Sequence, residues 1–320
     1  MRKARALWHT SASQSQIKEV ELSANPACVV KSLYSLISTG TERLVSRGQV
    51  PHALYASMKV PYMEGEFSFP VKYGYSLVGE VQEGPEEILG KKVHLLHPHQ
   101  DYCRVQASEL TVLPGEVPPL RATLASNLET ALNSIWDSGV SVGDRVLVVG
   151  FGIIGSLTAR LLQSIAGVEV WVYDLDAQRS ELASASGFHI VDRMLYDFDI
   201  AFHCSSSSKG LQSCIDHIGF EGKVMEMSWY GEQAVELQLG GSFHQQRKQI
   251  ISSQVSSIPS NHRARWDFNR RKAVVMELLK NPAYDQHLGE QVPFDKVPAL
   301  FGNIRKGSLS ALSWVIAYDQ

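Results

Sequence analysis

The chain has few of the features that mark secreted, membrane-spanning or nucleic-acid-binding proteins. It contains only four cysteines, and none forms a C-x-x-C pair, so neither a disulfide framework nor a zinc ribbon is indicated and a reducing cytoplasm is expected. Its longest apolar stretch, from Val146 to Leu162, is interrupted by three glycines, whereas a membrane span needs about 20 apolar residues. The formal charge of −3 lacks the basic excess that is typical of general nucleic-acid binding.

Two contrasting patterns along the 320 residues predict an α/β protein with two domains. Residues 1–123 contain short apolar runs between turn signals, such as 28–33, 76–81 and 92–96, which are typical of a β-rich, barrel-like domain. From Leu124 onward, expected strands at 145–149, 168–173, 199–203 and 223–227 alternate with helical segments. This alternation predicts a doubly wound parallel sheet. A strand expected at 309–317 is predicted to return to the first domain.

A glycine-rich turn follows the first buried strand of the second domain and opens a helix. It reads Gly150-Phe151-Gly152-Ile153-Ile154-Gly155. In such a turn the first glycine permits a tight bend, the second lets a pyrophosphate approach the backbone, and the third lets helix and strand pack closely. The helix N-terminus adds free N–H groups and the positive end of a dipole. This context predicts a dinucleotide site, although glycines can also shape a sheet that binds no ligand.

The coenzyme predicted for this turn is NAD. Asp174 lies 19 residues beyond Gly155, at the end of the second strand, where a carboxylate can accept both ribose hydroxyls and repel a 2′-phosphate. Arg179 leaves NADP open, because it could stack on adenine or pair with a 2′-phosphate. The remaining residues that we assign to the coenzyme site are Ile153, Ile154, Thr130, Cys204 and Ser205.

With this glycine turn and the segments given next, the chain resembles the medium-chain dehydrogenase/reductase superfamily over essentially its whole length. The segments Ile37-Ser38-Thr39-Gly40-Thr41-Glu42 and Asn127-Leu128-Glu129-Thr130-Ala131 are similar to the branch that contains the bacteriochlorophyllide hydroxyethyl dehydrogenase. His97-Pro98-His99-Gln100 and Ser252-Ser253-Gln254-Val255 are similar to bacterial relatives labelled zinc-binding alcohol dehydrogenases. The resemblance implies a GroES-like domain, residues 1–123 and 282–320, and a Rossmann domain, residues 124–281. It also implies a homodimer formed through the edge of the Rossmann sheet.

The positions that bind zinc in this superfamily carry other residues here. The ligand cysteine corresponds to Thr39, the histidine and glutamate of the Gly-His-Glu motif to Tyr75 and Ser76, and the third ligand falls near Ser126. The four-cysteine structural lobe expected after Val93 is missing. Because a catalytic zinc needs about three protein ligands, we predict no metal. His94, His97, His99 and Asp101 lie close together in the sequence and leave one alternative metal site open.

Without zinc, hydrogen-bond donors must stabilise the developing oxyanion. By position, Thr41 matches the hydroxyl that relays protons in the zinc relatives, and Tyr75 replaces a ligand histidine. We predict that Tyr75 donates a proton after nearby positive charge lowers its pKa, and that His97 or His99, sharing one face of an extended segment, completes the relay. The alternatives are that Tyr75 only packs, that Thr41 caps a turn, and that Glu42 is a salt-bridge partner at the domain junction.

A basic, aromatic segment is a second candidate for substrate binding. Residues 263–272 contain five basic side chains interleaved with two aromatic ones, and arginine suits bidentate contact with carboxylates or phosphates. Arg263, Arg265 and Trp266 could therefore clamp an anionic substrate. The alternative is a solvated helix face.

Taken together, these patterns predict an NAD(H)-dependent, zinc-independent oxidoreductase. Its substrate would be a small molecule, a secondary alcohol or ketone that could be anionic, and no nucleic acid or membrane is expected as a partner. Two alternatives are an NADPH-dependent C=C reductase of the enoyl or quinone type and a regulatory protein that binds NAD without turnover.

Overall fold

The computed structural model describes residues 3–22, 28–191, 196–307 and 311–319. By its internal contacts the chain divides into two units: unit 1 is Met1–Ser126 with Lys272–Gln320, and unit 2 is Asn127–Arg271. The junctions predicted after residues 123 and 281 lie three and ten residues from these divisions. Among the described residues, no helix is both long and apolar enough to cross a membrane.

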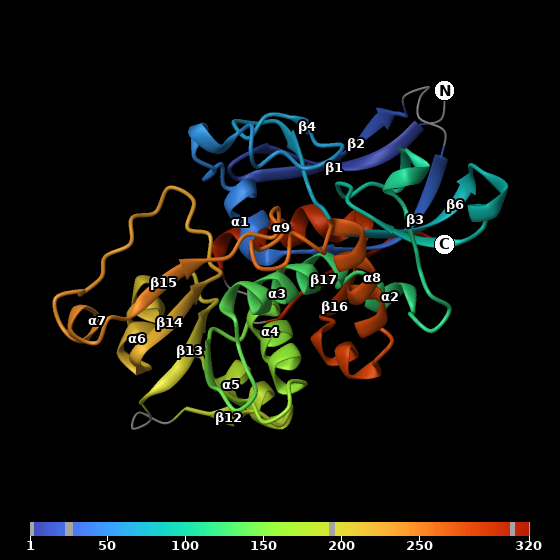
Figure 1. Ribbon diagram of the computed structural model, residues 1–320. Coiled ribbons are helices and arrows are strands. Elements are labelled where there is room, and N and C mark those ends of the chain that lie inside the picture. Colours follow the sequence, from blue (N-terminus) through green and yellow to red (C-terminus); the bar gives the residue numbers. More distant parts are fainter. Residues whose placement is uncertain (1–2, 23–27, 192–195, 308–310, 320) are drawn as a thin grey trace. The chain divides into compact units, whose positions relative to one another are not determined.

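Unit 2 is built on a parallel sheet, seen edge-on between helices in Figure 1. The strand order is β12-β11-β10-β13-β14-β15, so the chain winds outward from β10 to one edge and then from β13 to the other. This is the doubly wound topology that the sequence predicts. The strands are β10 (Arg145–Val149), β11 (Glu169–Tyr173), β12 (His189–Ile190), β13 (Phe198–His203), β14 (Ile218–Glu226) and β15 (Gln249–Ser252). The helices are α3 (Ala125–Ser138), which begins in unit 1, α4 (Ile153–Gln163), α5 (Ala177–Ala185), α6 (Ser208–His217) and α7 (Ser242–Gln245).

The central strand β10 is buried on both faces, which explains its unbroken apolar sequence. Leu147 and Val149 belong to a buried cluster with residues of α6 such as Leu211 and Ile215. In the parallel register, Val149 pairs with Tyr173 of β11 and with His203 of β13. The residues that follow these three strands therefore emerge at one edge of the sheet.

Unit 1 is β-rich. One sheet has the order β2-β1-β5-β4 and another the order β16-β17-β3-β6-β7-β9, with β8 pairing β3. Figure 1 shows the red strand β17 beside the blue strand β3, which it pairs in antiparallel fashion, so the predicted return of the C-terminal segment to the first domain is confirmed; residues 308–310, where the expected strand begins, lie outside the described residues. The strands are β1 (Lys3–Ser11), β2 (Gln14–Glu21), β3 (Cys28–Ile37), β4 (Glu64–Gly65), β5 (Val71–Lys72), β6 (Leu77–Glu83), β7 (Lys92–Leu95), β8 (Tyr102–Val105), β9 (Thr111–Val112), β16 (Glu290–Pro293) and β17 (Trp314–Ala317).

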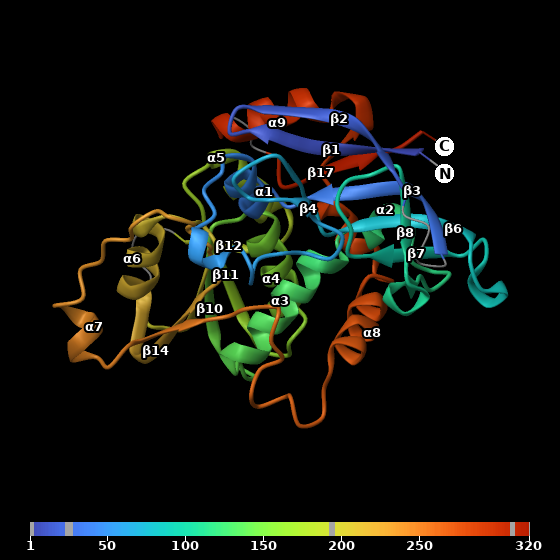
Figure 2. The same cartoon turned by 90° about the horizontal axis from the view of Figure 1, so that it is seen from above.

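Helices close the ends of these sheets. Figure 2 shows α9 (Val297–Lys306) against the β1–β2 hairpin, and its Phe301 and Ile304 share a buried core with Leu7 and Trp314. The helix ends at Gly307, whose φ of +70° is the left-handed conformation that glycine adopts at little cost. The other helices are α1 (Thr39–Ser46), α2 (Pro119–Ala122) and α8 (Phe268–Leu278), with single 3₁₀ turns at His52–Leu54, Glu86–Ile88, Ala107–Glu109, Pro282–His287 and Phe294–Lys296.

Candidate functional site

Two of the three glycines in the turn after β10 are required by the fold itself. Gly150 has a φ of +96°, and a Cβ there would lie 2.8 Å from the carbonyl carbon of Cys204. A Cβ on Gly155 would overlap the carbonyl oxygen of Gly150. These positions give the tight bend and the close helix–strand packing that the sequence predicts.

Gly152 differs, because nothing in the fold fills the space beside it. Its φ of −78° suits any residue, and the nearest atom to a Cβ there would be Nη1 of Arg179, 4.0 Å away. Gly152 is also the N-cap of α4, an eleven-residue helix whose first N–H groups have no intrahelical partner. The turn therefore leaves an open, positively polarised place suited to a diphosphate.

Asp174 and Arg179 border this turn, as predicted. One carboxylate oxygen of Asp174 accepts a hydrogen bond from the N–H of Phe151 at 2.6 Å and the other from the N–H of Asp176 at 2.8 Å. Asp174 thus fixes the turn and keeps a negative charge at the end of β11. The Nε atom of Arg179 is buried without a hydrogen-bond partner, and its nearest carboxylate, on Asp176, is 3.9 Å away.

The remaining residues assigned to the coenzyme have varied surroundings. Ile153 is buried and Ile154 half-buried in the first turn of α4, and Thr130 is half-buried on α3. Cys204 and Ser205 follow β13 directly, and their backbone packs on Gly150. These last two residues therefore lie at the same sheet edge as the glycine turn.

A separate buried network lies within unit 1. Glu42 of α1 is fully buried; one of its carboxylate oxygens accepts the N–H of Ser38 at 2.8 Å and the other contacts Nε2 of His99 at 2.9 Å. Since a carboxylate only accepts, Nε2 of His99 carries the hydrogen. The network continues from Nδ1 of His99 to the hydroxyl of Ser35 at 2.8 Å, and from Ser35 to the hydroxyl of Tyr318 at 2.8 Å.

Glu42 therefore hydrogen-bonds to Ser38 and His99 inside unit 1 rather than forming the salt bridge predicted at the domain junction. Sequence reasoning identified His99 but missed Ser35 and Tyr318. Ser35 lies on β3, Glu42 on α1, His99 in the loop between β7 and β8, and Tyr318 directly after β17. No local spacing connects them.

Tyr75 lies beside this network, with the side chains of Ser38 and Thr41 near its phenol. Burial, followed by the negative charge of Glu42, raises the pKa of Tyr75 to about 12. The prediction that positive charge lowers this pKa is therefore wrong, because the nearest charged group is a carboxylate. At neutral pH, Tyr75 is a neutral phenol that can donate a hydrogen bond.

His97 lies outside this network. Strand β7 ends at Leu95, so residues 93–101 do not continue as one extended segment and the predicted common face for His97 and His99 is wrong. Nδ1 of His97 donates to the carbonyl of Pro98 at 2.8 Å, and its ring stacks on Tyr62. Burial lowers the pKa of His97 to about 3, so the ring is neutral at physiological pH.

The predicted substrate clamp lies far from the glycine turn within unit 2. Trp266 packs against Trp136 near the end of α3, and the guanidinium of Arg270 lies 3.8 Å from its ring centroid. Arg263 and Arg265 are exposed nearby. Helix α3 ends just before β10 begins, so this cluster lies toward the N-terminal edge of the sheet. The glycine turn is at the opposite, C-terminal edge.

Comparison with known proteins gives partial sequence matches to dehydrogenases. No family model matches the chain. D-guloside 3-dehydrogenase of Escherichia coli K12 is 26% identical over 165 residues, 47% of each chain. A zinc-type alcohol dehydrogenase-like protein of Haemophilus influenzae is 23% identical over 151 residues, 43% of this chain and 44% of that one. The matches span about half the length of these curated relatives.

Solved structures match over the whole chain. A short chain alcohol dehydrogenase from E. coli CFT073 complexed with NADH superposes with a TM-score of 0.75 at 17% identity, covering 98% of this chain and 99% of that one. S. aureus TarJ in complex with NADPH gives 0.74 at 18% identity, covering all of both chains. The chain therefore shares the two-domain fold of these solved dehydrogenases, and about half of it is similar in sequence to curated dehydrogenases.

The residues that the sequence resemblance aligns with zinc ligands form a donor set that does not fit zinc. Ser76 donates to the carbonyl of Thr123 at 2.6 Å and Ser126 to that of Tyr75 at 2.8 Å, and Thr39 and Tyr75 offer only a hydroxyl and a phenol. Zinc prefers thiolate, imidazole and carboxylate ligands. Among the described residues, no three such side chains are grouped to hold a metal, the histidines of residues 94–99 included.

Proposed function

We propose that this chain is a medium-chain dehydrogenase/reductase that oxidises a secondary alcohol, or reduces the corresponding ketone, with a nicotinamide coenzyme and without zinc. The observation that carries the proposal is the glycine turn. Two of its glycines are needed to build it, whereas the space beside Gly152 is left open and faces a helix N-terminus. A role in folding alone does not account for glycine at position 152, but the approach of a diphosphate does.

NAD(H) is the proposed coenzyme. The carboxylate of Asp174 stands next to the turn, where it favours ribose hydroxyls and disfavours a 2′-phosphate. Arg179 favours NADP(H), because its Nε makes no hydrogen bond and has only a 3.9 Å ion pair with Asp176, and solved structures of similar fold bind either coenzyme. Calorimetry with NADH and NADPH on the same preparation tests the choice: NADH should bind at least tenfold more tightly. Absence of binding heat with either coenzyme would contradict the whole proposal.

Hydrogen-bond donors of unit 1 are proposed to polarise the substrate oxygen. The coenzyme, when bound, supplies or accepts the hydride. Tyr75, held protonated by burial and by Glu42, would donate a hydrogen bond from its phenol, and Thr41 would orient that phenol. One preorganised donor of this kind is worth about 3 kcal/mol in the transition state.

Zinc independence has its own test. Elemental analysis of the purified protein should find far less than one zinc per chain, and turnover should be unchanged after dialysis against a chelator. Stoichiometric zinc together with chelator-sensitive turnover would show that other residues bind the metal.

The proposal extends to assembly and location. Strand β15 is one edge of the parallel sheet, and we propose a homodimer formed through this edge, which light scattering can measure. The four cysteines are free thiols, which supports a cytoplasmic location. The substrate is proposed to be a small polyol or hydroxyl compound, in line with a relative named as a guloside dehydrogenase.

A further inference from the structure

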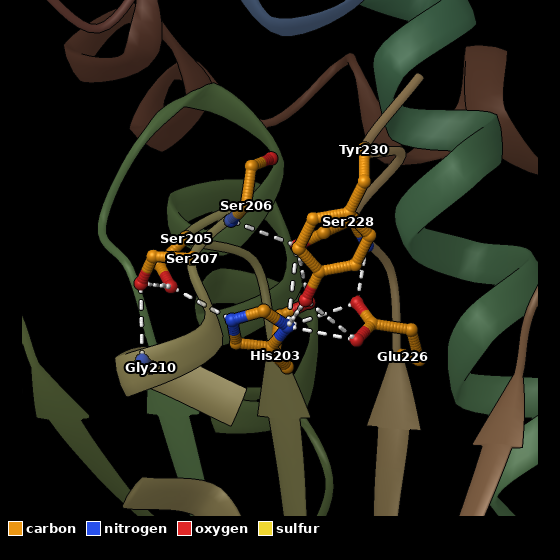
Figure 3. Close-up of polar contacts among 8 residues, drawn as sticks. All are labelled: His203, Ser205, Ser206, Ser207, Gly210, Glu226, Ser228 and Tyr230. Carbon is orange, nitrogen blue, oxygen red and sulfur yellow. Dashed lines mark hydrogen bonds and ion pairs between the residues drawn. The ribbon is translucent and has the colours of Figure 1, made fainter. Parts of the chain in front are cut away.

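A second polar cluster lies at the C-terminal edge of the sheet in unit 2, where the side chains of Ser205, His203 and Glu226 point toward one another (Figure 3). The backbone of Ser205 also packs on Gly150 of the glycine turn. His203 ends β13 and Glu226 ends β14, and Ser205 follows two residues after His203. Nδ1 of His203 lies 2.9 and 3.0 Å from the two carboxylate oxygens of Glu226, and Nε2 lies 2.7 Å from the hydroxyl of Ser205. These are hydrogen-bond distances for a serine, a histidine and a carboxylate in series.

The direction of each hydrogen bond follows from the carboxylate. Glu226 can only accept, so Nδ1 of the His203 ring carries the hydrogen, and Ser205 donates its hydrogen to Nε2 in the arrangement that suits a nucleophilic serine. Because the single hydrogen of the Ser205 hydroxyl is then used, the hydroxyl of Ser207, 3.1 Å away, donates to Ser205, and Ser207 in turn accepts the N–H of Gly210 at 3.0 Å. All the hydrogens point toward Glu226, an arrangement in which each bond polarises the next.

Glu226 is held in place by groups other than the histidine. It accepts the N–H of Ser228 at 2.7 Å and the hydroxyl of Tyr230 at 3.1 Å. His203 is fully buried, so its ring cannot turn toward solvent. A carboxylate fixed in this way orients the imidazole and stabilises the imidazolium that forms when Nε2 takes up a proton.

Ser205, by contrast, is exposed, and the backbone of the residues that follow it determines where its hydroxyl lies. Gly210 is in the first turn of the ten-residue helix α6, and a Cβ there would overlap the hydroxyl of Ser205. Glycine at this position therefore leaves the space that the hydroxyl occupies. Ser206 has a φ of +51°, a left-handed conformation that is strained for a residue other than glycine. The hydroxyl therefore sits at the positive end of a helix dipole, where negative charge is stabilised.

We propose that Ser205 is a reactive nucleophile, activated by His203 and Glu226, that cleaves small carboxylic esters. The Ser205 oxygen forms a bond to the ester carbonyl carbon while its proton passes to Nε2 of His203. The carbon–alkoxide bond then breaks, and His203 returns the proton to the departing alcohol. Water hydrolyses the acyl-serine by the same proton transfers, which regenerates Ser205 with no net oxidation or reduction.

This inference does not depend on the proposed dehydrogenase activity, and its test uses no coenzyme. The full chain is treated with an alkyl fluorophosphonate, which forms a bond between phosphorus and a nucleophilic serine oxygen and expels fluoride. Intact mass and peptide mapping should show one adduct, on Ser205. Hydrolysis of p-nitrophenyl acetate should show a burst of nitrophenolate that the reagent abolishes.

Three variants make the test specific. Ser205→Ala should lose the adduct and the burst, while Ser208→Ala, the matched change of a neighbouring serine outside the hydrogen-bond series, should keep both. Glu226→Gln preserves the shape of the side chain and should slow labelling at least tenfold, because Glu226 orients the general base His203, and a general base contributes on the order of 100-fold or more. The inference is overturned if the wild type gains no adduct, if Ser205→Ala is labelled equally, or if Glu226→Gln reacts at the wild-type rate.

Discussion

Tyr75 shows how a single residue depends on its surroundings. Burial, and then the buried carboxylate of Glu42, raise its pKa to about 12. The sequence singled out the residue because it replaces a ligand histidine of the zinc relatives, but it could not reveal the sign of the nearby charge, because Glu42 is folded against it from a helix about 30 residues away in the sequence. A donor that stays protonated suits carbonyl polarisation better than proton release.

Replacing this phenol tests its role. Tyr75→Phe should lower kcat at least tenfold, because one preorganised donor is lost, while the affinity for NADH stays unchanged in calorimetry. Tyr73→Phe is the matched control, since Tyr73 is a neighbouring buried tyrosine whose ring meets that of Tyr75 edge-on; its turnover should stay near that of the wild type. Equal kcat for Tyr75→Phe and wild type would remove Tyr75 from the mechanism.

Two buried histidines make the fold sensitive to acid. The pKa values of His9 and His97 are each lowered from 6.5 to about 3, chiefly by burial. Between pH 6.5 and pH 3 the unfolded chain binds protons that the native protein does not, so the stabilisation is present above pH 6.5 and is lost as the pH falls toward 3.

For each of these histidines, the free energy of unfolding should therefore fall by about 2 kcal/mol between pH 7 and pH 5. The variant His97→Gln has no ring to titrate, and its unfolding free energy in urea should fall less over this interval than that of the wild type, by roughly this amount. Comparing the two pH values within each protein cancels any constant effect of the substitution. Identical losses for both proteins would show that His97 is already protonated in the native state.

At the scale of elements, substitutions at two glycines of the turn after β10 should affect folding and coenzyme binding separately. Gly155→Ala should destabilise unit 2 by several kcal/mol, since its new methyl would overlap the backbone of Gly150. Gly152→Ala should change the unfolding free energy by less than about 1 kcal/mol, because the space there is open and only an N-cap preference is lost. Its affinity for NADH should nevertheless fall at least tenfold in calorimetry. Unchanged affinity would mean that the open space beside Gly152 is not where the diphosphate lies.

Predictability from the sequence differs between the two units. Strand β10 was predicted with its observed ends, and β13 within one residue, because a run of apolar residues is a local signal. Helix α1 and the hairpin of β1 and β2 were missed. Their apolar residues are few or half-buried, and the hairpin takes its core from α9 at the other end of the chain.

The residues of the candidate sites also differ in how well the sequence could predict their positions. Gly150, Asp174 and Ser205 could be found because they directly follow predicted strands, whose ends meet at one edge. The partners of Ser205 were also at strand ends, since His203 and Glu226 end β13 and β14, yet their pairing depends on two strands lying side by side in register. Arg263, Arg265 and Trp266 form a pattern of suitable chemistry, but the fold puts them toward the other edge of the sheet.

At the scale of the whole molecule, unit 2 is inserted within unit 1, so the two should lose structure independently. Val315 is fully buried in β17, and Val315→Asp places an unpaired charge in the sheet of unit 1. Limited proteolysis of this variant should degrade residues 1–126 and leave a protected fragment close to 127–271. Coenzyme affinity measured on that digest should match the wild type; loss of both units together would show that they unfold as one.

The pairing of β3 with β17 also determines when the sheet of unit 1 can be completed during translation. Ile37 and Trp314 are opposite each other in the sheet, yet about 280 residues separate them along the chain. At roughly 5–20 residues per second, a ribosome makes the first partner on the order of 15–60 s before the second. During that interval the nascent N-terminal strands have an open edge, so cells that make this protein must shield that edge from neighbouring chains until translation is complete.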